Sequence, residues 1–138
     1  MRRVLNMNTN SNSLHFWLLL LRIAVACFML THGWPKVEKV IAGNYQFADT
    51  VGIGSKASLI LVVFAEAICS VLILIGLVTR LATIPLIINM AVAAFIALGQ
   101  APFEKKELAL LYLLIYITIA VLGPGKYSVD AARNRGFR

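Results

Sequence analysis

Residues 57–78 read ASLILVVFAEAICSVLILIGLV, and the single charged residue in this stretch is Glu66, near its middle. Crossing a hydrocarbon core of roughly 30 Å takes about 20 helical residues, so the stretch predicts a membrane-spanning helix. A charge near the centre of such a helix costs about 2.5–3.5 kcal/mol on insertion scales. We therefore expect Glu66 to face other helices and to be paired there.

The whole composition indicates a membrane protein. The 138 residues are 60% hydrophobic and 14% charged, with a mean hydropathy of +0.84, which is far from a soluble domain. Four apolar segments separated by polar or Gly/Pro-containing breaks predict an all-α protein, an antiparallel bundle of four transmembrane helices at Leu14–Leu30, Ala57–Val78, Leu81–Leu98 and Leu108–Leu122. The last segment is short for a span, so we expect its helix to begin a turn earlier, near Glu104 to Glu107.

The breaks between the segments indicate how the domain is organised. We expect a polar N-terminal tail over residues 1–13, a membrane domain over 14–125 and a basic C-terminal tail over 126–138. Thr79 and Arg80 alone separate the second and third segments, which predicts a tight helical hairpin. The longer connection before the second segment contains VEKVIAGNYQF, residues 37–47, which predicts a short amphipathic helix lying in the membrane interface.

The formal charge of +7 comes from residues near the ends of the segments, so it favours contact with lipid headgroups over nucleic acid. The predicted topology puts seven basic residues on the side of the termini and five, interleaved with acids, on the other side. This bias favours a topology with both termini in the cytoplasm. A cleaved signal peptide is disfavoured, because thirteen residues precede the first apolar run and Arg22 interrupts it. The seven are Arg2, Arg3, Arg80, Lys126, Arg133, Arg135 and Arg138, and the five are Lys36, Lys39, Lys56, Lys105 and Lys106.

Each predicted helix carries one polar residue close to its midpoint. Arg22, Glu66, Asn89 and Tyr116 are the ninth or tenth residues of their segments. We expect Arg22 and Glu66 to form an ion pair, and Asn89 and Tyr116 to complete a hydrogen-bonded layer around it. Such a layer can bind a ligand or carry protons, or it can serve only to fix which helix packs on which.

A second polar cluster is expected at the outer face, where the first helix ends and the fourth begins. There, His32 could exchange a proton with Glu107 or hold a polar headgroup. The alternative is that His32 caps its helix before Gly33 and Pro35 end it.

The two cysteines do not indicate a redox pair. Cys27 and Cys69 are predicted to differ in depth by roughly 12 Å, at 1.5 Å per helical residue, whereas a disulfide needs Cα atoms within about 7 Å. With His15 and His32 as the only histidines, no metal or haem site is predicted.

Several short motifs, taken together, resemble the DoxX family of small four-helix membrane proteins. They appear in the expected order and, with Arg22, extend to Asp130. The matching pieces are THGWPK (31–36), FAEAICS (64–70), GLVTRLA (76–82), ELALLYL (107–113) and GPGKYSVD (123–130).

The resemblance implies a membrane partner of redox enzymes. Some members of the family are described as subunits linked to thiosulfate oxidation with transfer of electrons to quinone, and one is associated with a sulfurtransferase and a superoxide dismutase. Relatives elsewhere are cargo receptors. The resemblance also implies candidate site residues, namely Arg22, His32, Glu66 and Glu107. The sequence contains no cofactor motif of its own, so a redox role requires a bound quinone or a partner protein.

Two main hypotheses follow. In the first, the chain is a redox-linked subunit of the bacterial inner membrane that binds a quinone-like or small apolar ligand, with Arg22 and Glu66 as the polar end of the site. The further ligand-binding candidates are His32, Asn89, Glu107, Tyr112 and Tyr116. This hypothesis predicts a cavity between the helices. In the second, the chain is a non-catalytic adaptor that recruits a protein through its outer loop or basic tail, which predicts a filled core. A third possibility is a small transporter, which would have to form a homo-oligomer because four helices are too few for one chain to transport a solute.

Overall fold

The computed structural model describes residues 11–136, and all regular secondary structure in this range is helical. The chain first forms one long helix and then a second rod that changes from α-helix to π-helix and back. A third rod ends in a π-helical turn, and a fourth helix and a short C-terminal helix follow. The elements are α1 (Ser11–Ile41), α2 (Ser55–Val63), η1 (Phe64–Cys69), α3 (Ser70–Ile75), α4 (Thr79–Val92), η2 (Ala93–Ala97), α5 (Phe103–Leu122) and α6 (Val129–Gly136).

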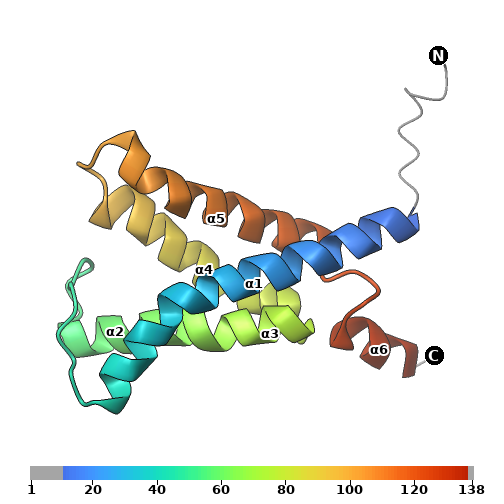
Figure 1. Cartoon of the computed structure of the whole chain (residues 1–138), viewed down its shortest axis with the longest axis horizontal. Coiled ribbons are helices and arrows are strands. Elements are labelled where there is room, and N and C mark those ends of the chain that lie inside the picture. The colour runs from blue at the N-terminus through green and yellow to red at the C-terminus, as the bar shows by residue number, and fades with distance from the viewer. Residues whose placement is uncertain (1–10, 137–138) are drawn as a thin grey trace.

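The helices give the molecule two different ends. The start of α1 lies near α6 at one end, which we call the termini end (Figure 1). The connections 42–54 and 98–102 lie at the opposite end, which we call the loop end. The α1 helix packs along the α2–η1–α3 rod, and α5 packs mainly along α4.

Three of the rods are long and apolar enough to cross a membrane: Ser11–Ile41, Ser55–Ile75 and Thr79–Ala97. The chain is therefore a multi-pass membrane protein by the length and composition of its helices. The α5 helix has 20 residues, but its first turns carry Glu104, Lys105, Lys106 and Glu107. Its start at Phe103 confirms that the fourth helix begins before Leu108.

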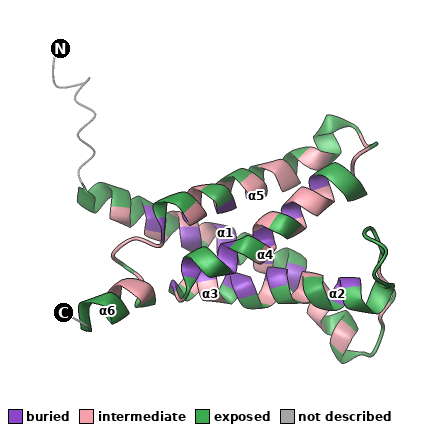
Figure 2. Ribbon diagram, turned by 180° about the vertical axis from the view of Figure 1, so that it is seen from behind, coloured by how far each residue is buried: buried purple, intermediate pink, exposed green. Residues whose placement is uncertain are grey.

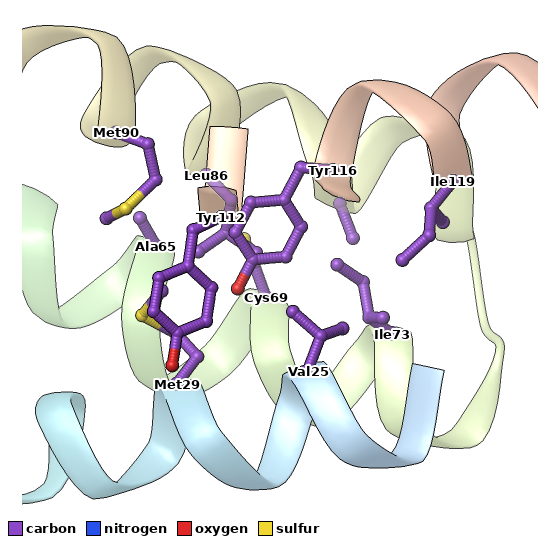
Figure 3. Packing of buried hydrophobic residues seen from close by; sticks show 11 residues of the cluster. Val25, Met29, Ala65, Cys69, Ile73, Leu86, Met90, Tyr112, Tyr116 and Ile119 are labelled. Atoms are coloured by element: carbon purple, nitrogen blue, oxygen red, sulfur yellow. The ribbon is translucent and has the colours of Figure 1, made fainter. Parts of the chain in front are cut away.

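Burial divides the helices into inward and outward faces. Buried residues face neighbouring helices, and the outer surfaces are exposed (Figure 2). Many exposed side chains are large and apolar, including Phe28, Phe95 and Leu114, as expected for surfaces in contact with lipid. The core cluster draws on every long rod (Figure 3) and contains Val25, Met29, Ala65, Cys69, Ile73, Ala82, Leu86, Met90, Tyr112, Tyr116 and Ile119.

The first helix is longer than predicted. The prediction ended it at Leu30, but α1 continues through Gly33 and Pro35 to Ile41. A proline inside a helix removes one backbone hydrogen bond and crowds the preceding turn, but membrane helices tolerate proline and glycine where neighbouring groups satisfy the backbone. The separate interfacial helix predicted over residues 37–47 is therefore wrong, because residues 37–41 belong to α1 and residues 44–49 have no regular structure.

The hairpin after the second rod also lies a few residues earlier than predicted. The turn is Gly76–Val78, and Thr79 and Arg80 already belong to α4. Gly76 has φ +76°, and a Cβ added there would lie 2.5 Å from the Ser128 Cβ, so this position requires glycine.

Candidate ligand-binding site

Glu66 is buried and lies within the π-helical segment η1. Its Oε2 accepts a hydrogen bond from Lys36 Nζ at 2.5 Å, and its Oε1 accepts one from Asn89 Nδ2 at 2.9 Å. Side chains from α1 and α4 thus meet on one carboxylate. Single π-helical turns often occur at functional sites, because they redirect a side chain out of the regular helical register.

Gly33 allows α1 to lie directly against Glu66. A Cβ added to Gly33 would be 3.1 Å from the carbonyl carbon, the carbonyl oxygen and the Cβ of Glu66. Small residues let helix backbones approach closely in membranes. Lys36 lies three residues after Gly33, about one helical turn on, so the same close approach brings its ammonium group to the carboxylate.

The predicted ion pair between Arg22 and Glu66 is wrong. Both side chains are buried, but Arg22 lies opposite Leu74 near the termini end, whereas Glu66 lies opposite Gly33. Leu74 and Glu66 are eight residues apart, roughly 12 Å along a helix. The two residues have similar positions within their apolar runs but differ in depth, because α1 continues eleven residues beyond the predicted end at Leu30.

Arg22 instead binds the backbone at the termini end. Its Nη1 donates to the Pro124 carbonyl at 2.6 Å, and its Nη2 donates to the carbonyls of Tyr127 at 3.0 Å and Leu74 at 3.4 Å. The guanidinium thus joins α1, the end of α3 and the segment between α5 and α6. This assigns Arg22 a structural position outside the candidate site.

Asp130 completes the same connection. Its carboxylate accepts hydrogen bonds from the Val78 and Thr79 backbone N–H groups at 2.8 and 2.9 Å and from the Thr79 hydroxyl at 2.9 Å. Partial burial would raise the pKa of Asp130, but these hydrogen bonds to Thr79 and Val78 outweigh it and hold the pKa below its usual range. The motifs GLVTRLA and GPGKYSVD therefore pack on each other and close the termini end.

A cavity of about 540 Å³ opens between the second and third rods. Its walls come from α2, η1, α4 and η2, and residues 47–53 of the loop cover part of it. Most of the lining is apolar, including Leu61, Phe64 and Ile88, and the polar side chains of Lys36, Glu66 and Asn89 gather in one part of it. We call this space the first cavity.

The covering loop is organised by Asp49. Its carboxylate accepts hydrogen bonds from the backbone N–H groups of Gly54, Ile53 and Gly52 at 2.9–3.0 Å and from the Ser58 hydroxyl at 3.2 Å. These hydrogen bonds, that from Gly54 first, hold the pKa of Asp49 below its usual range. The carboxylate therefore stays ionised at neutral pH and fixes the loop to the start of α2.

A second cavity of about 180 Å³ lies between α1, the end of the third rod and α5. Lys36, Glu66 and Ala93 line both cavities. The remaining lining residues of this second cavity are Met29, His32, Met90, Leu98, Lys105, Leu108, Ala109 and Tyr112. Of these, His32, Lys105 and Leu108 are exposed, so they mark its opening toward the loop end.

Two tyrosines continue from the second cavity into the core. The ring of Tyr112 makes an edge contact with His32, with centroids 6.0 Å apart, and stacks on Tyr116 at 6.1 Å (Figure 3). Tyr116 is fully buried, and its hydroxyl and that of Ser70 make no well-aligned hydrogen bond within residues 11–136. Tyr116 therefore does not complete the predicted layer with Glu66, and Asn89 is the one predicted member that does bind the carboxylate.

The predicted cluster at the outer face is only partly assembled. His32 lies in the middle of α1, so it does not cap the end of a helix. Glu107 is exposed and lines neither cavity. Cys27 is exposed and Cys69 is buried, and both are free thiols.

Lys36 is the residue of the site that the sequence analysis missed. The predicted topology places Lys36 among the outer charges, because Gly33 and Pro35 are typical of a helix end. A signal for its role was available, since Lys36 follows His32 by four residues and Gly33 by three, and residues at these spacings share one face of a continuous helix.

The structure thus defines a class of protein: a multi-pass helical membrane protein with a partly open, mostly apolar cavity between its helices and polar groups at one end of that cavity. The sequence model of the DoxX family matches residues 17–99, which is more than half of the chain. The chain therefore belongs to the DoxX family, as its motifs predicted. Comparisons with curated proteins and with solved structures give no match.

Proposed function

We propose that this DoxX-family protein is the membrane subunit of a redox-linked complex and that it binds a quinone-like or other small apolar ligand in the first cavity. The observation that carries the proposal is an apolar cavity of about 540 Å³ with Lys36, Glu66 and Asn89 in its wall. Ligand sites commonly have volumes of about 300–1,000 Å³, mostly apolar walls and a few orienting polar groups.

The polar end of the cavity has hydrogen-bonding capacity left over. Lys36 uses one ammonium N–H on Glu66, and Asn89 uses its amide N–H₂ on the same carboxylate. A lysine ammonium has three donors, and an asparagine also offers a carbonyl oxygen. A ring carbonyl can accept from Lys36, and a ring hydroxyl can also donate to Asn89 Oδ1, so both the oxidised and the reduced form of a quinone suit this end.

The proposed membrane arrangement has four antiparallel spans. The α5 helix is about 30 Å long, at 1.5 Å for each of its residues, which is enough for the hydrocarbon core. The start of α1 and α6 lie at the same end, as an even number of crossings requires (Figure 1). The basic residues Arg80, Lys126, Arg133 and Arg135 belong to segments at this end, which supports a bacterial inner-membrane location with cytoplasmic termini.

The test is mass spectrometry of the protein purified from its native host in mild detergent. Wild-type protein is expected to retain a quinone or another small apolar molecule near one per chain. The Val92→Trp variant, which obstructs the first cavity, should lose it. Phe95→Trp places the same side chain on the exposed face one turn away and should retain the molecule. Equal retention by both variants would exclude the cavity as the site.

The adaptor hypothesis has one favourable observation, the exposed apolar side chains of Trp34, Ile41, Val51 and Ile53 near the loop end. It also predicted a filled core, whereas the helices leave two cavities around Glu66. In the same purification, a protein partner whose binding is lost in Ile41→Ser/Ile53→Ser, with no small molecule retained by wild-type protein, would favour recruitment by the outer loop.

A further inference from the structure

Glu66 separates two spaces of different character. The first cavity is mostly apolar and lies between the second and third rods, whereas the second cavity opens at the loop end beside His32 and Lys105. The carboxylate and Lys36 line both. A proton on Glu66 can therefore be exchanged with a ligand on one side and with a different space on the other.

The second cavity can hold water. Its volume of about 180 Å³ is several times the space one water molecule occupies, and a buried water needs two to four polar partners. Polar groups line it from the carboxylate to its opening: Lys36 and His32 on α1, and Tyr112 and Lys105 on α5. The termini end is occupied by the contacts of Arg22 and Asp130, so this water would communicate with the loop end.

We infer that Glu66 is a proton-transfer residue that links a ligand in the first cavity to water at the loop end through the second cavity and His32. The inference rests on the proposed function, because the ligand is the source of the proton. When a proton moves from the ligand toward the loop end, an O–H bond of the ligand breaks and an O–H bond forms on Glu66. Lys36 then loses its partner on Glu66 and pairs with the ligand oxyanion.

The return step restores the ion pair. The proton leaves Glu66 for a water in the second cavity and passes through His32 to bulk water, and the carboxylate pairs with Lys36 again. Two ammonium groups near Glu66 favour this release, that of Lys36 on α1 and that of Lys105 on α5. The other polar groups that face this region are His32 on α1, Tyr112 on α5 and the uncharged Asn89 on α4. The rod that carries Glu66 has no other charge between Ala57 and Ile75.

The test follows the protonation of Glu66 by time-resolved infrared spectroscopy after a downward pH jump, on full-length protein in detergent with no added ligand. Wild-type protein is expected to develop a carboxylic acid band that Glu66→Gln lacks. Ala109→Phe obstructs the second cavity, and it should slow the appearance of this band about tenfold, as expected if one water-mediated step is lost. Phe95→Trp lies on the exposed surface outside both cavities and should leave the rate unchanged.

The inference is overturned if wild-type protein shows no band that depends on Glu66, or if Phe95→Trp slows the band as much as Ala109→Phe does. Circular dichroism checks the fold of each variant. Should Ala109→Phe fail to fold, His32→Asn, at an exposed position, must slow the band instead, and an unchanged rate there would also overturn the inference. Because no quinone is present, failure of the proposed function appears separately, as absence of retained quinone in wild-type protein.

Discussion

Removing Lys36 should lower the free energy of unfolding, because it leaves the buried Glu66 carboxylate without its cation. Glu66 is 4% exposed, and Lys36→Met leaves its carboxylate with Asn89 as the one hydrogen-bond donor within residues 11–136. Removing one partner of a fully buried pair costs about 3–5 kcal/mol. Because the Lys36 side chain is 26% exposed, water can reach the site, and we expect about 2–3 kcal/mol.

The double variant Lys36→Met/Glu66→Met should be little worse than Lys36→Met alone, because no unpaired charge remains in the bundle. We expect a coupling energy of about 2 kcal/mol in this double-mutant cycle. The assay is reversible unfolding in mixed micelles by increasing SDS, followed by circular dichroism. The matched control is a second double-mutant cycle that uses Lys39, an exposed lysine on the same helix, in place of Lys36.

The control cycle of Lys39→Met with Glu66→Met should be additive within about 0.5 kcal/mol. If the Lys36 cycle is equally additive, the pair does not hold α1 against η1, and the geometry of the site described above is refuted.

Four further changes test other contacts. Glu66→Gln should destabilise less than Glu66→Ala in the same assay, because the amide can still accept from Asn89; equal and severe losses would show that the charge itself is required. Gly33→Leu should separate α1 from η1, and a cysteine-free variant with spin labels on both helices should show a longer distance in pulsed EPR, while an unchanged distance contradicts the close approach. Gly76→Ala should cost about 1–3 kcal/mol, from its positive φ and the contact with Ser128, and a neutral effect would contradict this packing. Asp130→Asn should cost about 1–2 kcal/mol at pH 7. Because the folded pKa of Asp130 lies below the unfolded value, this contribution is complete above that value and is lost as the pH falls through the folded pKa, so the two proteins should converge in acid; a constant difference down to about pH 2 would contradict this assignment.

The rods were predictable because long apolar runs have few structural solutions in a membrane. The second and third rods, Ser55–Ile75 and Thr79–Ala97, lie within a few residues of their predicted ranges. The end of α1 was not predictable from local signals, since Gly33 and Pro35 ordinarily indicate a helix stop. What overrides them is a contact distant in sequence, the packing of Gly33 on Glu66.

The site was predicted in part for the same reason. A carboxylate in an apolar run must find partners, so Glu66 and its bond to Asn89 followed from energetics. Which cation it binds depends on the register between α1 and η1. Local sequence does not determine that register. Because Arg22 and Lys36 carry the same charge, the sequence does not show which of them pairs with Glu66. The Arg22 contacts with Pro124 and Tyr127 are to backbone carbonyls, which no side-chain pattern reveals.

The most direct test of the central claim is photoaffinity labelling with an azido-quinone in membranes, followed by mapping of the labelled peptides. If the first cavity is the quinone site, the label should fall on residues 61–66 and 84–97, should be displaced by an excess of unlabelled quinone and should be lost in Val92→Trp but not in Phe95→Trp. Labelling that is confined to the lipid-facing surfaces, or that excess quinone does not displace, would contradict the claim that this DoxX-family protein binds a quinone beside Glu66.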